Sequence, residues 1–284
     1  DRIADFAARG ATAAAGPAAM MAACDTVITC LPSPAASAAV VEGPGGILEA
    51  MAPGKTWLEM STTDADEVKR LAAKVAAAGG RAADVPVSGG CHRAATGNIS
   101  IFAGCDRETF DAVLPLLTIL GRRVLHTGPL GSASVLKVMT NYLATANLLT
   151  LCEAFVTMKA AGMDMATTYE AIRISSGTSF VHETESQLIL SGARDVNFTM
   201  DLVQKDIGLF QKIAEDHAVP LELSPLLIEI MADGQRRYGE RAQSDRIVER
   251  LEEATGLAIR APGFPDELVD DEPEERGQEV RPPR

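Results

Sequence analysis

The sequence has few cysteines, no excess of basic residues and no long uncharged hydrophobic run. Its five cysteines are odd in number and lack a Cys-x-x-Cys spacing, which argues against a disulfide framework and against a zinc or other metal site. The net charge of −13 argues against a nucleic-acid partner, because a phosphate backbone requires a basic binding face. These absences favour a reducing compartment, so we expect a cytoplasmic location.

No membrane partner is expected either. Lys137, Glu153 and Lys159 interrupt the longest apolar stretch, which therefore falls short of the roughly 18 uncharged residues that a membrane-spanning helix needs. The opening sequence DRIADFAARG lacks the basic-then-apolar order of a signal peptide and is typical of a helix. With 284 residues, of which 46% are hydrophobic and 23% charged, the chain is long enough for two ordinary globular domains.

Strand-like segments alternate with helical segments over residues 1–129. The segments with strand character are 26–32, 56–62, 81–90, 98–104 and 122–128. Ala-rich helical segments lie between them, and one of these begins after the capping-type residues Thr63 and Asp64. This alternation predicts the α/β fold class, with a Rossmann-type parallel sheet domain over residues 1–129.

Helical patterns replace the strands beyond Gly128. A long helix is predicted over residues 130–161, and the helical segments that follow predict an all-α domain over residues 130–258. Residues 259–284, which we call the tail, are rich in proline and acidic residues and are expected to be a solvated extension. The alternative is that the tail docks on a partner subunit through Phe264 and the APGFP turn.

One charge stands in the apolar stretch that follows Gly128. Lys137 and Asn141 are four residues apart, so on a helix they share one face and form a polar spot. Either the lysine extends its ammonium group to water, or it is kept partly desolvated so that its proton can be used in chemistry. The stretch alone does not decide between the two.

Two further patterns have both a structural and a functional interpretation. The Ser88-Gly89-Gly90 turn follows a strand and could direct backbone N–H groups and a hydroxyl at an anion, or could simply connect a strand to a loop. Lys205 stands beside Asp206 on a predicted helix, where a surface ion pair is the usual explanation.

Five motifs occur in the order and spacing of the β-hydroxyacid dehydrogenase family, which the chain resembles over about residues 1–255. The motifs are TCLP at 29–32, EMSTTD at 59–64, DVPVSGGCHRAATG at 84–97, GPLGSASVLKVMTN at 128–141 and QKDIGL at 204–209. The resemblance implies an oxidoreductase that transfers a hydride between a short β-hydroxyacid, such as 3-hydroxyisobutyrate, and NAD, with NADP as a further possibility. It also implies a homodimer or a homotetramer.

The same resemblance implies the catalytic residues. Lys137 would be the general acid or base for the hydroxyl proton, and Asn141 would hold the lysine or the substrate oxygen in line. A lysine on an apolar helix suits this role, because desolvation lowers its pKa toward the working pH.

Binding roles follow from the resemblance as well. The Ser88-Gly89-Gly90 turn would bind the substrate carboxylate, and Lys205 would reach over both the nicotinamide and the substrate. Leu31, Pro32 and Thr62 would line the nicotinamide at the ends of two strands, where ligands collect in such sheets.

Three features depart from the family pattern. Arg93 stands where a glycine is usual and is expected either to contact the distal end of the substrate or to face solvent. Asn98 replaces a customary threonine, a change that the sequence does not explain. The opening strand and the G-x-G-x-x-G turn of the family are missing from the printed sequence, and GPGG at 43–46 is no substitute because no strand leads directly into it.

The missing turn leads to an expectation and to an alternative. We expect the upstream reading frame to encode a strand, the turn and a helix, and the 284-residue chain to bind NAD poorly. The alternative function is a non-catalytic dehydrogenase-derived binding or oligomerisation module that has lost dinucleotide binding. Retention of Lys137, Asn141 and Lys205 favours the enzyme, because a scaffold has no need of a buried lysine.

Overall fold

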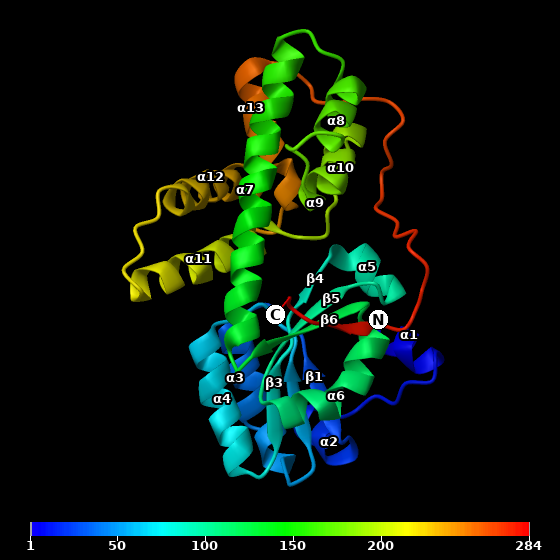
Figure 1. Cartoon of the computed structure of the whole chain (residues 1–284), viewed down its shortest axis with the longest axis vertical. Helices are drawn as coiled ribbons and strands as arrows, with labels where there is room; N and C mark the ends of the chain where they lie inside the picture. The colour runs from blue at the N-terminus through cyan, green and yellow to red at the C-terminus, as the bar shows by residue number, and fades with distance from the viewer. Residues whose placement is uncertain (1, 284) are drawn as a thin grey trace.

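A computed structural model describes residues 2–283 and shows a sheet domain and a helical domain joined by one long helix (Figure 1). The strands are β1 (Thr26–Thr29), β2 (Thr56–Glu59), β3 (Arg81–Asp84), β4 (Val87–Ser88), β5 (Ser100–Gly104), β6 (Arg123–Gly128) and β7 (Gln278–Val280). The helices of the sheet domain are α1 (Arg2–Ala8), α2 (Pro17–Ala23), α3 (Pro34–Glu42), the 3-10 helix η1 (Ile47–Ala50), α4 (Ala65–Ala77), α5 (Gly90–Thr96) and α6 (Arg107–Leu120). The helical domain comprises α7 (Ser132–Ala160), α8 (Met165–Arg173), α9 (Phe180–Glu183), α10 (Glu185–Ser191), α11 (Met200–Asp216), α12 (Leu223–Tyr238), the 3-10 helix η2 (Ser244–Val248) and α13 (Glu249–Thr255).

The strand order is β1-β2-β3-β5-β6-β7, and β4 pairs with β5. Strands β1 to β3 are mutually parallel, as are β5 to β7, so the predicted Rossmann-type α/β fold class is confirmed. Strand β5 runs antiparallel to β3 and β4, a reversal that the sequence did not predict. The segment predicted as one strand over 81–90 is divided into β3 and β4 at Pro86, which has no N–H group to donate to a ladder.

Three hydrophobic clusters form the interior of the protein. One lies between the sheet and α6 around Phe110, and a second lies beneath α2, α3 and α4 around Trp57. The third fills the helical domain around Phe155 of α7. Across the part of the chain that the structure describes, no helix is long and apolar enough to cross a membrane.

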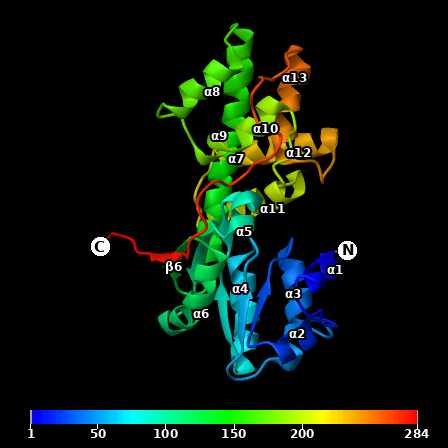
Figure 2. The same ribbon diagram turned by 90° about the vertical axis from the view of Figure 1, so that its right-hand side faces the viewer.

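The expectation of no strand after β6 is wrong, and the tail, although most of its residues are exposed to solvent as expected, is docked on the sheet domain. The tail runs down the outside of the molecule from the helical domain to the sheet, where β7 adds to β6 in parallel (Figures 1 and 2). Glu279 of β7 pairs with Arg107 of α6 at 2.7 Å. Phe264 packs edge-on against Tyr169 of its own chain, with ring centroids 4.9 Å apart. The tail is ordered because its main chain continues the sheet and its acidic side chains meet arginines of the sheet domain.

Candidate active site

Lys137 lies in the second turn of α7 and is almost completely buried, with 7% of its surface exposed. Its Nζ donates a hydrogen bond to Oδ1 of Asn141 at 2.6 Å. Burial lowers the pKa of Lys137 to about 8; Asp206 opposes this shift and Lys205 adds to it. The structure therefore holds a desolvated lysine at this position and not one that extends to water.

A chain of polar contacts runs from Lys137 through Asn141 to Asp206 on α11, and from Asp206 to Lys205. Asn141 donates from Nδ2 to Oδ2 of Asp206 at 2.5 Å, and Lys205 Nζ lies 2.7 Å from Oδ1 of the same carboxylate. Burial raises the pKa of Asp206, whereas Lys205, Asn141 and Lys137 act to lower it. From the sequence, Asp206 is expected only as the ion-pair partner of Lys205, although Asp206 is itself part of the QKDIGL motif.

Lys205 also reaches from the helical domain to the end of a strand. Its Nζ donates to the carbonyl oxygen of Thr62, just beyond β2, at 2.5 Å. The backbone N–H of Leu31, just beyond β1, donates to Ser61 Oγ at 2.7 Å and joins the two strand ends. Leu31, Pro32 and Thr62 thus lie at the carboxyl edge of the sheet. Because Lys205 contacts this edge as well as Asp206, its ion pair is not an ordinary surface ion pair.

The Ser88-Gly89-Gly90 turn connects β4 to α5, and its two glycines have positive φ angles of 133° and 84°. Burial raises the pKa of the Cys30 thiol, with further influence from Glu59, Lys205 and Cys91. Within residues 2–283, no hydrogen bond joins the turn to Lys137 or Lys205.

Arg93 has an environment that neither expected alternative included. Its Nη2 donates to Oε1 of Glu272 in the tail at 2.7 Å, and its Cζ lies 5.1 Å from the centroid of the Phe180 ring. The side chain is 23% exposed, so it does not simply face solvent. Asn98 likewise contacts the tail, where its Nδ2 donates to Oδ2 of Asp270 at 2.6 Å.

Asp84, at the end of β3, fixes the start of α7 one turn before Lys137. Its Oδ1 accepts from the backbone N–H of Gly131 at 2.8 Å, and its Oδ2 accepts from the N–H and Oγ of Ser134 at 2.7 and 2.9 Å. Burial raises the pKa of this carboxyl, and the hydrogen bonds from Gly131 and Ser134 limit the rise. The sequence predicts no role for Asp84, although the residue opens the DVPVSGGCHRAATG motif.

The residues present fit the reactive end of a nicotinamide dinucleotide. Leu31, Pro32 and Thr62 lie at the ends of two parallel strands, and Lys205 Nζ donates a hydrogen bond to the carbonyl oxygen of Thr62 there. The glycines at 43–46 follow the end of α3, where a Cβ at Gly43 would lie 2.4 Å from the carbonyl oxygen of Ala39, so glycine is required at this position. These glycines allow a tight turn after α3, as expected from the lack of a preceding strand.

Comparisons with known proteins divide the chain at the same place as the fold. Residues 1–128 match the NAD binding domain of 6-phosphogluconate dehydrogenase, and residues 131–251 match the NAD-binding domain of NADP-dependent 3-hydroxyisobutyrate dehydrogenase. The chain is 30% identical to 2-(hydroxymethyl)glutarate dehydrogenase of Eubacterium barkeri over 258 residues, which are 90% of this chain and 86% of that protein. It is 30% identical over 233 residues to the mitochondrial 3-hydroxyisobutyrate dehydrogenase of Rattus norvegicus, covering 80% of this chain and 70% of that protein.

A solved structure shares the fold. The 3-hydroxyisobutyrate dehydrogenase of Salmonella typhimurium superimposes with a TM-score of 0.79 at 23% identity, over 87% of each chain.

Proposed function

Because the chain belongs to the β-hydroxyacid dehydrogenase family, we propose that it transfers a hydride between a short β-hydroxyacid resembling 3-hydroxyisobutyrate and NAD, with NADP as the alternative. Members of this family use a nicotinamide dinucleotide and act on small hydroxyacids. The observation that carries the proposal is the buried Lys137, whose Nζ is held by Asn141 at 2.6 Å. Family membership also leads us to propose a homodimer or a homotetramer.

The proposed role of Lys137 is proton transfer, and its burial supports this role. Bound nicotinamide would supply hydride transfer at the hydroxyl-bearing carbon. In the oxidation, the neutral Nζ of Lys137 accepts the hydroxyl proton; in the reduction, the protonated Nζ donates it. Asn141 orients Nζ, and its second hydrogen bond, to Asp206, keeps the amide from rotating.

Binding roles complete the proposal. Lys205 and the Ser88-Gly89-Gly90 turn bind the substrate carboxylate, and Arg93, whose stem lies beside Gly89, supports the turn. Lys205, Leu31, Pro32 and Thr62 line the nicotinamide. The shared contact of Lys205 with Thr62 and Asp206 supports this arrangement, because it brings the helical domain to the carboxyl edge of the sheet.

A substrate panel tests the proposal. Steady-state rates are measured for β-hydroxyacids, with α-hydroxyacids of equal length as controls, each with NAD and with NADP. We expect turnover of a short β-hydroxyacid and weaker or no turnover of its α-hydroxy isomer, because Lys137 is fixed relative to the carboxylate site. Calorimetric titration with both dinucleotides accompanies the panel. No turnover of any hydroxyacid despite dinucleotide binding would contradict the proposed activity.

The pH dependence of the two reaction directions should be opposite. In the oxidation, kcat/KM should rise with pH through a midpoint of about 8 and then level off, because Lys137 must lose its proton before it can accept another. In the reduction, kcat/KM should fall as the pH rises through the same midpoint, because the protonated form is the donor. Initial rates between pH 6 and pH 10, on the order of half a unit apart, measure both profiles. If kcat/KM showed no change near pH 8 in either the oxidation or the reduction, the assignment of Lys137 as the general acid or base would be contradicted.

Asp206→Asn should move the midpoint of both profiles to lower pH. The Asp206 carboxylate favours the charged form of Lys137, so removal of its charge makes the lysine easier to deprotonate. Asp216→Asn is the matched control, because Asp216 ends the same helix, is half exposed and pairs with Lys212 instead. If the pH profiles of Asp206→Asn and Asp216→Asn had the same midpoint, the coupling between Asp206 and Lys137 would be refuted.

A further inference from the structure

Two of the departures from the family pattern converge on the tail. Arg93, where a glycine is usual, donates to Glu272 at 2.7 Å. Asn98, where a threonine is usual, is 2% exposed and donates from Nδ2 to Oδ2 of Asp270 at 2.6 Å and to the carbonyl oxygen of Glu272 at 3.0 Å. Arg93 and Asn98 on the sheet domain therefore share one partner segment, the tail.

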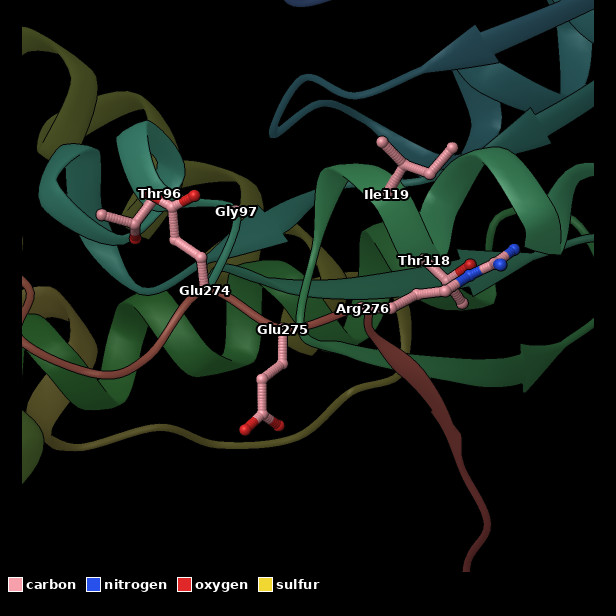
Figure 3. A pocket seen from close by; sticks show the side chains of 7 residues that line it. All are labelled: Thr96, Gly97, Thr118, Ile119, Glu274, Glu275 and Arg276. Atoms are coloured by element: carbon pink, nitrogen blue, oxygen red, sulfur yellow. The ribbon is translucent and has the colours of Figure 1, made fainter.

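The tail is anchored on both sides of these contacts. On the helical side, Ile259 is fully buried and its N–H donates to Glu252 Oε1 at 2.6 Å. On the sheet side, the N–H of Gly277 donates to the carbonyl oxygen of Thr118 at 2.8 Å, and β7 follows. Figure 3 shows the tail between these anchors, where it crosses the ends of α5 and α6 beside a cavity of about 380 Å³. The cavity is lined by Thr96, Gly97, Thr118, Ile119, Glu274, Glu275 and Arg276.

The contacts of the tail reach the substrate-binding turn through α5. Arg93 Cδ lies 3.3 Å from the position that a Cβ on Gly89 would occupy, so its stem covers the middle of the turn. Its guanidinium is held between Glu272 and the Phe180 ring of α9 in the helical domain. At the C-terminal end of α5, Thr96 donates from Oγ1 to Oδ2 of Asp270 at 2.5 Å. The tail thus contacts the middle and the C-terminal end of the helix that follows the turn.

We propose that tail residues Asp270 and Glu272 are positioning residues that hold α5, and with it the Ser88-Gly89-Gly90 turn, in the geometry that binds the substrate carboxylate. This inference rests on the proposed function, because the turn is assigned to the carboxylate there. A helix of seven residues with no buried residue of its own has little packing to fix it, so polar contacts from outside determine its position. Glu272 acts through Arg93, and Asp270 acts through Thr96 and Asn98.

The test compares the full chain with the double variant Asp270→Asn/Glu272→Gln. Amide hydrogen exchange of residues 89–98 should become at least about tenfold faster, whereas exchange in α7 should stay unchanged, because charge-assisted hydrogen bonds of this kind contribute about a factor of ten or more. The KM for the β-hydroxyacid should rise roughly tenfold while kcat changes by less than about twofold, because Lys137 is untouched. Glu274→Gln is the matched control, since Glu274 lies two residues along the tail and is exposed. It should change none of these quantities.

Each outcome of this test decides a separate question. Unchanged exchange in residues 89–98 would overturn the proposal. Faster exchange with an unchanged KM would overturn the positioning role while leaving the contact itself established. If the wild-type chain bound a dinucleotide but turned over no hydroxyacid, the proposed function would fail, and the exchange difference would still decide whether the tail holds α5.

Discussion

Replacing Lys137 by alanine should lower kcat for hydroxyacid oxidation by about 10²–10⁴-fold, the usual contribution of a general acid or base. The side chain is buried and bonded to Asn141, and burial lowers its pKa to about 8, so it can exchange a proton near neutral pH. Dinucleotide affinity, measured by calorimetric titration, should stay nearly unchanged because Lys137 moves the proton and does not hold the cofactor. A variant with wild-type turnover would end the assignment.

Lys137→Arg separates proton transfer from simple charge. Arginine keeps the positive charge but is not deprotonated in proteins, so this variant should be about as impaired as Lys137→Ala. Lys159→Ala is the control, because Lys159 lies in the last turn of the same helix, far from the site. Strong activity in Lys137→Arg would show that the position supplies charge and not a proton.

Replacing Asp84 by alanine should destabilise the protein by about 2–6 kcal/mol, because two buried backbone N–H groups would each lose their acceptor at about 1–3 kcal/mol. Asp84 is fully buried and receives the N–H groups of Gly131 and Ser134. The loss should also lower turnover, because α7 begins at this contact and carries Lys137 one turn later. Urea unfolding followed by circular dichroism measures the stability change.

Asp106→Ala provides the comparison for Asp84→Ala. Asp106 is the N-cap residue of α6, where its carboxylate accepts from the N–H and Oγ1 of Thr109 at 2.8 Å, but unlike Asp84 it is exposed and belongs to the segment that it caps. Loss of an exposed cap costs about 1 kcal/mol. Equal destabilisation by the two substitutions would show that the buried carboxylate adds nothing beyond an ordinary helix cap.

Periodicity and motif order were sufficient for the fold class and for the central lysine. The alternation of strand-like and helical segments predicted the sheet domain, and the apolar stretch after Gly128 predicted a long helix with Lys137 and Asn141 on one face. Both inferences depend on residues close together in the chain, because burial and helical spacing appear in the local pattern of apolar residues. The hydrogen bond from Lys137 to Asn141 spans four residues and is of this local kind.

Contacts between distant segments could not be predicted in this way. The bond from Asn141 to Asp206 spans 65 residues, and that from Arg93 to Glu272 spans 179. The composition of the tail suggested solvation, yet its acidic residues face arginines whose proximity depends on how the two domains are placed. The reversal of β5 likewise depends on strand pairing and not on the residues of β5 alone.

The sequence by itself determined the positions of β1, β2, β5, β6 and the long helix α7, and which lysine stands in an apolar environment, because local side-chain patterns set both. Only the tertiary structure decided that Asp84 fixes the start of α7, that Asp206 couples two lysines, and that the tail holds α5. These three features are pairings of polar groups across long loops. Such a pairing forms only after packing has brought the elements together, so its partners leave no pattern in the chain until the fold is known.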